Sequence, residues 1–163
     1  MTSKGPTKVC AFGTFDVLHL GHLRYLEEAK RLGGPHSELI VVVARDSSVK
    51  EIKGHTPVFP EQHRVTLVAE LKPVDRAVLG DEDPDKFIII EKLKPHILAI
   101  GYDQWVDLNH LREELNDRGL KHIQIVRLAK FEDELGGSST LIKKRIALLL
   151  NNWEEKSENE RKK

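Results

Sequence analysis

An α/β domain built on a parallel sheet is the fold class that this sequence predicts. The chain has 163 residues, enough for one domain with a substantial core at roughly 100–200 residues per domain. Five short apolar segments alternate with segments of helical periodicity. Strands that alternate with helices in this way form parallel sheets joined by right-handed crossovers.

Each expected strand is a short apolar run. Residues 9–12 end at Gly13 and residues 97–100 end at Gly101, and glycine there favours a tight turn. The run at residues 39–44 is continuously apolar and rich in valine, which is typical of a strand covered on both faces. The five expected strands are residues 9–12, 39–44, 76–79, 97–100 and 123–128.

The helices are expected between and after these strands. Leu23, Leu26 and Ala29 have helical spacing in the first of them. Asp83 and Pro84 are a favourable start for the third, a capping carboxylate followed by proline at the first helical position. The five expected helices are residues 21–32, 60–71, 83–93, 108–118 and 138–151. In the last helix we expect these side chains to face inward: Leu141, Ile142, Ile146, Leu149 and Leu150.

Two segments are expected to lie outside regular structure. Residues 45–60 have no sustained period and contain Gly54, Pro57 and Pro60, so we expect a long loop that a ligand orders as a lid. Residues 153–163 are almost entirely polar, which predicts a frayed C-terminal tail. The expected domain therefore covers residues 1–152.

Composition excludes several classes of protein. Lysine and arginine together number 26, as do aspartate and glutamate, so the formal net charge is zero. A neutral chain does not have the field of a general nucleic-acid or anionic-membrane binder. Neither an apolar signal core nor a membrane-length apolar run is present, so we expect a soluble, cytoplasmic protein. The single cysteine, Cys10, permits no internal disulfide and is expected to fill a strand.

The most informative stretch, residues 13–22, reads Gly-Thr-Phe-Asp-Val-Leu-His-Leu-Gly-His and lies between the first strand and the first helix. Ligands of parallel sheets bind beyond the carboxyl ends of the strands. His19 and His22 can point to one side of the helix entrance, and Gly21 lets a ligand approach the backbone. Backbone N–H groups at a helix start favour an anion, so the pattern is typical of a phosphate clamp. The alternative is that His19 caps a turn and His22 is a surface residue.

Two further segments lie where a ligand is expected. Ser138, Ser139 and Thr140 open the last helix, where hydroxyls bind an anion or only cap the helix. Asp103 follows the fourth strand within Gly-Tyr-Asp-Gln, where it contacts a ligand or only forms a turn.

The string Gly-Thr-Phe-Asp-x-x-His-x-Gly-His resembles the signature of the nucleotidylyltransferase superfamily, which is related to the HIGH motif of class I aminoacyl-tRNA synthetases. Residues 138–140 resemble, in place and order, the segment that starts the last helix of that superfamily and holds nucleotide phosphates. The resemblance covers residues 9–145 and is to the cytidylyltransferase-type branch. Within that branch it is greatest to the FMN adenylyltransferases (FAD synthases) of archaea, on residues 44–46, 53–54 and 101–104. The glycerol-3-phosphate cytidylyltransferases are the alternative.

The resemblance implies a Rossmann-like domain with strand order 3-2-1-4-5, helices on both faces of the sheet, and a homodimer. It implies transfer of AMP from ATP to the phosphate of FMN, with Mg²⁺ bridging the nucleotide phosphates. His19, His22 and Lys53 are the implied catalytic residues. The implied nucleotide contacts are Thr14, Phe15, His19, Leu20, Gly21, His22, Asp103, Lys130, Ser138, Ser139 and Thr140.

The sequence departs from the cytidylyltransferases near the last helix. Where they carry an arginine, residues 132–134 are acidic, and Leu141 replaces their lysine. Both changes remove positive charge near a triphosphate. The basic residues that could replace it are Lys50, Lys53, Lys130 and Lys143, and the role of Arg64 is left open.

Two weaker inferences concern the acceptor and the possibility that the protein is not an enzyme. Four aromatic residues near the crevice could stack on a flavin or belong to the core: Phe15, Tyr102, Trp105 and Phe131. A non-catalytic nucleotide sensor with this fold would be expected to have lost one of the two motif histidines, and both are present.

Overall fold

The strands of the computed structural model form one parallel sheet in the order β3-β2-β1-β4-β5, as the sequence resemblance implied. The structure describes residues 5–104, 106–131 and 138–161. β1 lies at the centre, where Val9 pairs with Leu39 on one side and with Ile97 on the other. The strands of the described residues are β1 (Thr7–Gly13), β2 (Ser37–Val43), β3 (Arg76–Leu79), β4 (Ile97–Ile100) and β5 (Gln124–Arg127).

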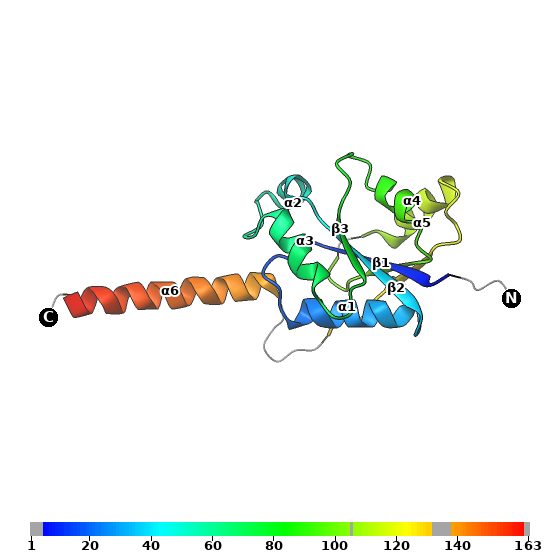
Figure 1. Ribbon diagram of the computed structural model, residues 1–163. Helices are drawn as coiled ribbons and strands as arrows, with labels where there is room; N and C mark the ends of the chain where they lie inside the picture. The colour runs from blue at the N-terminus through cyan, green and yellow to red at the C-terminus, as the bar shows by residue number, and fades with distance from the viewer. Residues whose placement is uncertain (1–4, 105, 132–137, 162–163) are drawn as a thin grey trace.

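Helices cover both faces of this sheet (Figure 1). Val9 and Ala11 of β1 pack with residues of α1 and α3, whereas the intervening Cys10 packs with residues of α4 and α5. Successive side chains of a strand point to opposite faces, so the central strands are buried on both. The helices are α1 (Leu20–Leu32), α2 (Asp46–Lys53), α3 (Glu61–Ala69), α4 (Ile88–Leu93), α5 (Leu108–Asp117) and α6 (Ser139–Arg161).

Cys10 fills the central strand as expected. Its side chain is fully buried, and burial raises the pKa of the thiol to about 12. The thiol therefore stays protonated and unreactive at neutral pH.

Two expected element boundaries were wrong. Residues 45–60 are not all loop, because α2 forms within them, buries Val49 and ends at Gly54 with a φ of 75°. The helix expected from residue 83 begins only at Ile88. Before it, the carboxylates of Asp83 and Asp85 accept backbone N–H groups two residues further on, and such local turns compete with a helix.

The last helix differs most from its expectation. Leu141, Ile146, Leu149 and Leu150 are exposed, with exposed fractions of 48–60%, so the expectation that these side chains pack inward was wrong. Figure 1 shows the reason, since α6 projects away from the sheet after its first turns. Its backbone continues as helix to Arg161, so the expectation of a frayed tail was wrong as well. The domain limits 1–152 stay a prediction.

Candidate active site

The loop after β1 is the centre of the site, and its backbone is unusual. Phe15 has a φ of 53° and Val17 a φ of 52°, in the left-handed region that residues other than glycine rarely adopt. Such backbone is costly, most of all for a β-branched residue, and it clusters at functional sites. The two residues flank Asp16, whose side chain is buried.

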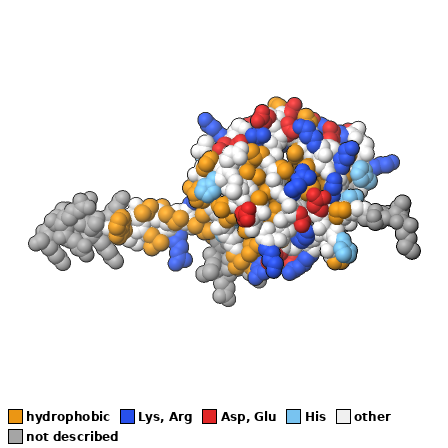
Figure 2. Space-filling view, in the orientation of Figure 1, with side chains coloured by type: hydrophobic (Ala, Val, Ile, Leu, Met, Phe, Trp, Pro, Cys, Tyr) orange, Lys and Arg blue, Asp and Glu red, His pale blue; other side chains and the backbone are white. Residues whose placement is uncertain are grey.

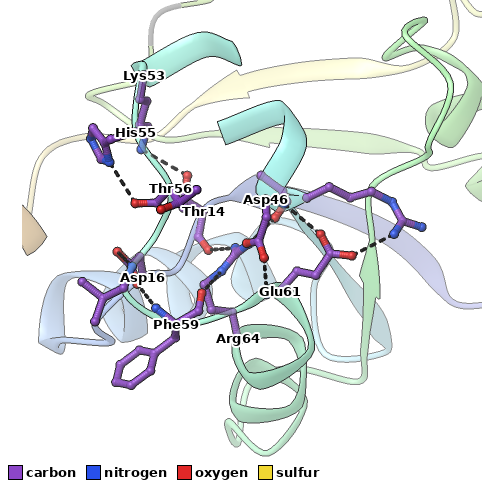
Figure 3. A network of polar contacts seen from close by, with 12 residues as sticks. Thr14, Asp16, Asp46, Lys53, His55, Thr56, Phe59, Glu61 and Arg64 are labelled. Carbon is purple, nitrogen blue, oxygen red and sulfur yellow. Dashed lines mark hydrogen bonds and ion pairs between the residues drawn. The ribbon is translucent and has the colours of Figure 1, made fainter. Parts of the chain in front are cut away.

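Asp16 connects this loop to two other segments. Its carboxylate accepts the backbone N–H groups of Val58 at 2.9 Å and Phe59 at 3.1 Å, and Lys143 Nζ at 2.6 Å. Its backbone carbonyl accepts Ser139 Oγ at 2.8 Å. Figure 3 shows the carboxylate turned toward Phe59. The segment before α3 and the start of α6 are therefore both held against the loop.

These contacts determine the charge of Asp16. Burial raises the pKa of the carboxyl, but the hydrogen bond from Lys143 and those from Val58 and Phe59 together hold the pKa below its ordinary value. Asp16 is consequently ionised at neutral pH and neutralises much of the charge of Lys143.

The motif histidines lie together at the N-terminus of α1. The rings of His19 and His22 are stacked with centroids 3.8 Å apart, and the backbone N–H of His19 donates to Nδ1 of His22 at 3.3 Å. Burial, followed by the nearby charge of His19, lowers the pKa of His22 to about 3. His22 is therefore neutral at pH 7, and because its Nδ1 accepts a hydrogen bond, the ring proton is on Nε2.

Lys53 comes to the same loop from the end of α2. Its Nζ donates to Thr14 Oγ1 at 3.1 Å (Figure 3). The charge of Lys53 is also near enough to contribute to the low pKa of His22. Neither α1 nor α6 has an acidic residue in its first turn, so both N-termini keep their positive character. The arrangement is suited to an anion.

Lys50, the other lysine considered for this role on α2, lies on the exposed surface of that helix.

Arg64 has a structural role, which settles what the sequence left open. Its side chain is fully buried, with Nε donating to the carbonyl of Phe59 at 3.0 Å. The other guanidinium nitrogens donate to the carbonyls of Thr14 and Ala44 and to the carboxylate of Asp46. Figure 3 shows this guanidinium enclosed between the loops. Arg64 therefore fixes the loop after β1 from behind.

A second group of residues follows β4 and β5. Asp103, Tyr102 and Arg127 help to line a shallow hollow of about 370 Å³. The guanidinium of Arg127 donates to the carbonyls of Gly101, Gln104 and Val106, which fixes this loop. Asp103 lines this hollow, and Lys130 lies over the ring of Tyr102 beside it.

The four aromatic candidates separate into different environments. Phe15 is buried, with its ring stacked 6.4 Å from that of Tyr25, so it belongs to the core. Tyr102 and Phe131 are 45% and 41% exposed, and each has a basic side chain over its ring, Lys130 over the first and Arg24 over the second. Trp105 and the acidic residues 132–134 lie outside the described residues.

The structure brings together Thr14, His19, His22, Lys53 and Ser139 around the loop after β1. Asp16 and Arg64, which hold this arrangement, received no role from the sequence. A signal for Arg64 existed in its spacing, since it lies one helical turn before the buried Val68 and so shares the inward face of α3.

A comparison with known protein families identifies the family to which this chain belongs. The family described as Cytidylyltransferase-like matches residues 10–145. The chain belongs to the cytidylyltransferase-like family. Members of this family are nucleotidyltransferases, and this chain has the family's fold and strand order.

Several relatives within the family are close to the whole chain. A protein of Korarchaeum cryptofilum named FAD synthase is 48% identical over 86% of this chain and 92% of its own length. An FAD synthase of Ferroglobus placidus is 47% identical over 93% of this chain and 97% of its own length. One of Methanobrevibacter ruminantium is 54% identical over 70% of this chain and 75% of its own.

A solved structure has the same fold. A protein of Thermoplasma volcanium described as a lipopolysaccharide core biosynthesis protein superposes with a TM-score of 0.73 at 45% identity. The match covers 78% of this chain and all of that chain.

Two features of the described residues concern the surroundings of the site. No helix among them is both long enough and apolar enough to cross a membrane. They also contain no group of three or more histidine, cysteine, aspartate or glutamate side chains placed to hold a metal ion.

Proposed function

We propose that this protein is an FMN adenylyltransferase, which transfers AMP from ATP to the phosphate of FMN and releases pyrophosphate. The observation that carries the proposal is the contact between the motif loop after β1, with its stacked histidines, and the start of α6, in a chain whose relatives named FAD synthase are 47–54% identical to it. Its substrates are ATP and FMN, and it acts in the cytoplasm.

The reaction needs alignment more than acid or base. A phosphate monoester is largely ionised near neutral pH, because its second pKa is about 6, so its oxygen can attack the α-phosphorus without a general base. A bond forms between an oxygen of the FMN phosphate and the α-phosphorus of ATP. The bond between that phosphorus and the oxygen that bridges to the β-phosphate breaks, and pyrophosphate leaves. The protein has to place the two reactants in line and stabilise charge on the phosphates.

The residues around the loop after β1 supply that stabilisation. The neutral ring of His22 has its Nε2 proton available for a phosphate oxygen, and the stacked ring of His19 offers a second donor. Lys53 is held at Thr14 and adds a full positive charge. The backbone N–H groups at the starts of α1 and α6, with Ser138 and Thr140, complete an anion site.

Magnesium enters this proposal as part of the Mg–ATP substrate. The described residues offer no cage of three carboxylate, imidazole or thiolate ligands. Mg²⁺ keeps several waters and is commonly held through substrate phosphates, so this donor set suits an ion that arrives with the nucleotide. The ion neutralises phosphate charge when it is bound.

The second group of residues is placed to recognise the remainder of the substrates. Asp103 lies beside the hollow after β4 and offers an acceptor for a ribose or base, with Lys130 nearby over Tyr102. Tyr102 and Phe131 are exposed enough to stack on a planar ring. We propose that these residues contact the nucleoside and flavin portions.

Isotope transfer tests the proposal directly. With ATP labelled at the α-phosphorus, label should appear in FAD, and with ATP labelled at the γ-phosphorus, it should appear only in pyrophosphate. The matched control is the His22→Ala protein, which should give neither product at a comparable rate. Label from the γ-phosphorus in a flavin product would instead show a kinase and overturn the proposal.

A further inference from the structure

The helices α2 and α3 cap each other at their N-termini. The Glu61 carboxylate accepts the backbone N–H of Asp46 at 2.8 Å, and the Asp46 carboxylate accepts the backbone N–H of Glu61 at 3.2 Å (Figure 3). The residues that precede the two helices, Arg45 and Pro60, supply no side-chain cap of their own. Each helix therefore obtains from the other the acceptor that a helix start ordinarily takes from its own N-cap residue.

Each of the two carboxylates also has an arginine partner. Arg45 Nη1 lies 2.9 Å from Glu61 Oε1, and both side chains are at most 23% exposed. Arg64 Nη2 lies 2.7 Å from Asp46 Oδ1. Figure 2 shows acidic and basic side chains interspersed over the visible face of the domain, and isolated ion pairs on such a surface contribute little to stability. The carboxylates of Asp46 and Glu61 differ, because each also accepts a backbone N–H, which fixes one helix relative to the other.

The orientation of α2 depends on this contact because little else holds the helix. Of its eight residues, all of which the structure describes, only Val49 is buried. Lys53 is the last residue of α2 and lies four residues beyond Val49, which is about 6 Å along the axis at a rise of about 1.5 Å per residue. If the helix pivots about Val49, a tilt of about 10° therefore moves Lys53 by about 1 Å.

A displacement of that size matters for Lys53. Its Nζ donates to Thr14 Oγ1 at 3.1 Å, and its charge lies near His22. Misplacing a group in an active site by about 1 Å can lower the rate by about 10²-fold. We propose that Glu61 is a positioning residue for the phosphate site, because it caps α2 and thereby holds Lys53 where the phosphates of ATP bind. The inference rests on the proposed function, and in it Glu61 acts through Lys53 and does not itself contact a substrate.

A double-mutant cycle tests whether Glu61 acts through Lys53. Glu61→Ala should lower kcat for FAD formation by about tenfold or more when Lys53 is present. In the Lys53→Met protein, the same change should lower kcat by less than about twofold, because the group that Glu61 positions is already gone. A side chain that only stabilises the fold would lower kcat by the same factor in both backgrounds. That result, or an unchanged kcat in both, would overturn the proposal.

Further variants of the same region separate the cap from the ion pair. Glu82 lies in the loop after β3, 81% exposed and 3.3 Å from Arg45 Nη2, so Glu82→Ala is the matched control and should leave kcat unchanged. Glu61→Gln keeps an oxygen that can accept the backbone N–H of Asp46 and should retain most of kcat. A loss in either variant as large as that in Glu61→Ala would contradict the proposal. If circular dichroism shows that Glu61→Ala is not folded, Glu61→Ser takes its place in the cycle, because serine is too short to reach α2 but is favourable at a helix start.

Binding of inorganic tripolyphosphate distinguishes a failure of this inference from a failure of the proposed function. This anion occupies a phosphate site without any reaction, and calorimetric titration measures its affinity. Glu61→Ala should weaken binding severalfold when Lys53 is present and cause no further loss in the Lys53→Met protein. A wild type that forms no FAD but shows this pattern would overturn the proposed function and support the role of Glu61. A wild type that forms FAD but loses equal affinity in both backgrounds would overturn the role of Glu61 alone.

Discussion

Replacing Arg64 by methionine should destabilise this protein by about 3–4 kcal/mol. The guanidinium is fully buried and donates to three backbone carbonyls and to the Asp46 carboxylate. Methionine nearly fills the same space, so the cost of a cavity is small. The loss is then that of the hydrogen bonds and of the charge pair.

The magnitude follows from the exposure of the groups left behind. Breaking a buried ion pair costs about 3–5 kcal/mol when the remaining charge is buried. The Asp46 side chain is 36% exposed, so water can solvate its carboxylate and this part of the cost falls. The carbonyls of Thr14, Ala44 and Phe59 each lose a donor, at about 1–3 kcal/mol for any that water does not reach. The total is a large part of the 5–15 kcal/mol typical of a domain.

Urea denaturation followed by circular dichroism measures this change. Arg31→Met is the matched control, because its side chain is 67% exposed, and its ion pair with Glu28 on the surface should contribute less than about 1 kcal/mol. Equal and small changes in the two variants would refute the argument that Arg64 holds the loop after β1.

Three further predictions concern the site. His22→Ala should lower turnover by roughly 10²-fold without loss of folding. The control is His110→Ala, on the exposed surface of α5, which should leave turnover unchanged. Steady-state rates of the two variants measure the difference. Lys53→Met should lower kcat for FAD formation by a similar factor, and unchanged kcat would remove Lys53 from the phosphate site. The pKa of His22 falls from 6.5 to about 3 on folding, so the unfolded chain binds the extra proton between these values. The free energy of unfolding that depends on neutral His22 should therefore be fully present above pH 6.5 and should fall as the pH drops below that value. The fall should be smaller in His22→Ala.

The sheet could be predicted because its signals are local. Residues 76–79 and 97–100 were predicted at the bounds that β3 and β4 have, since each is a short apolar run between polar or glycine residues. The strand order was not determined by the apolar pattern. It came from the resemblance carried by residues 13–22.

The short helices were harder to predict because distant contacts stabilise them. α2 is positioned by contacts with α3, where Glu61 accepts the backbone N–H of Asp46 and Arg45 Nη1. These partners are more than 14 residues apart in the sequence, so the pattern of residues 45–60 alone indicated a loop. That this segment acts as a lid stays a prediction.

The site was predicted in part for a similar reason. The histidines and the hydroxyls of α6 belong to motifs that can be read along the chain. Asp16 lies inside the first motif, but its function depends on Val58, Phe59 and Lys143, which only the fold brings to it. The apolar residues of α6 were expected to be core because they have helical periodicity. That periodicity identifies an apolar face of a helix but does not show whether this face packs against its own domain.

Product formation with four substrate pairs tests the central claim most directly. The purified protein is incubated with Mg²⁺ and either ATP or CTP, together with either FMN or glycerol 3-phosphate, while pyrophosphate release and FAD are measured. We expect pyrophosphate and FAD in equal amounts with ATP and FMN, and far slower release with the other three pairs. Pyrophosphate released only with CTP and glycerol 3-phosphate, or release from none of the four pairs, would contradict the proposed function.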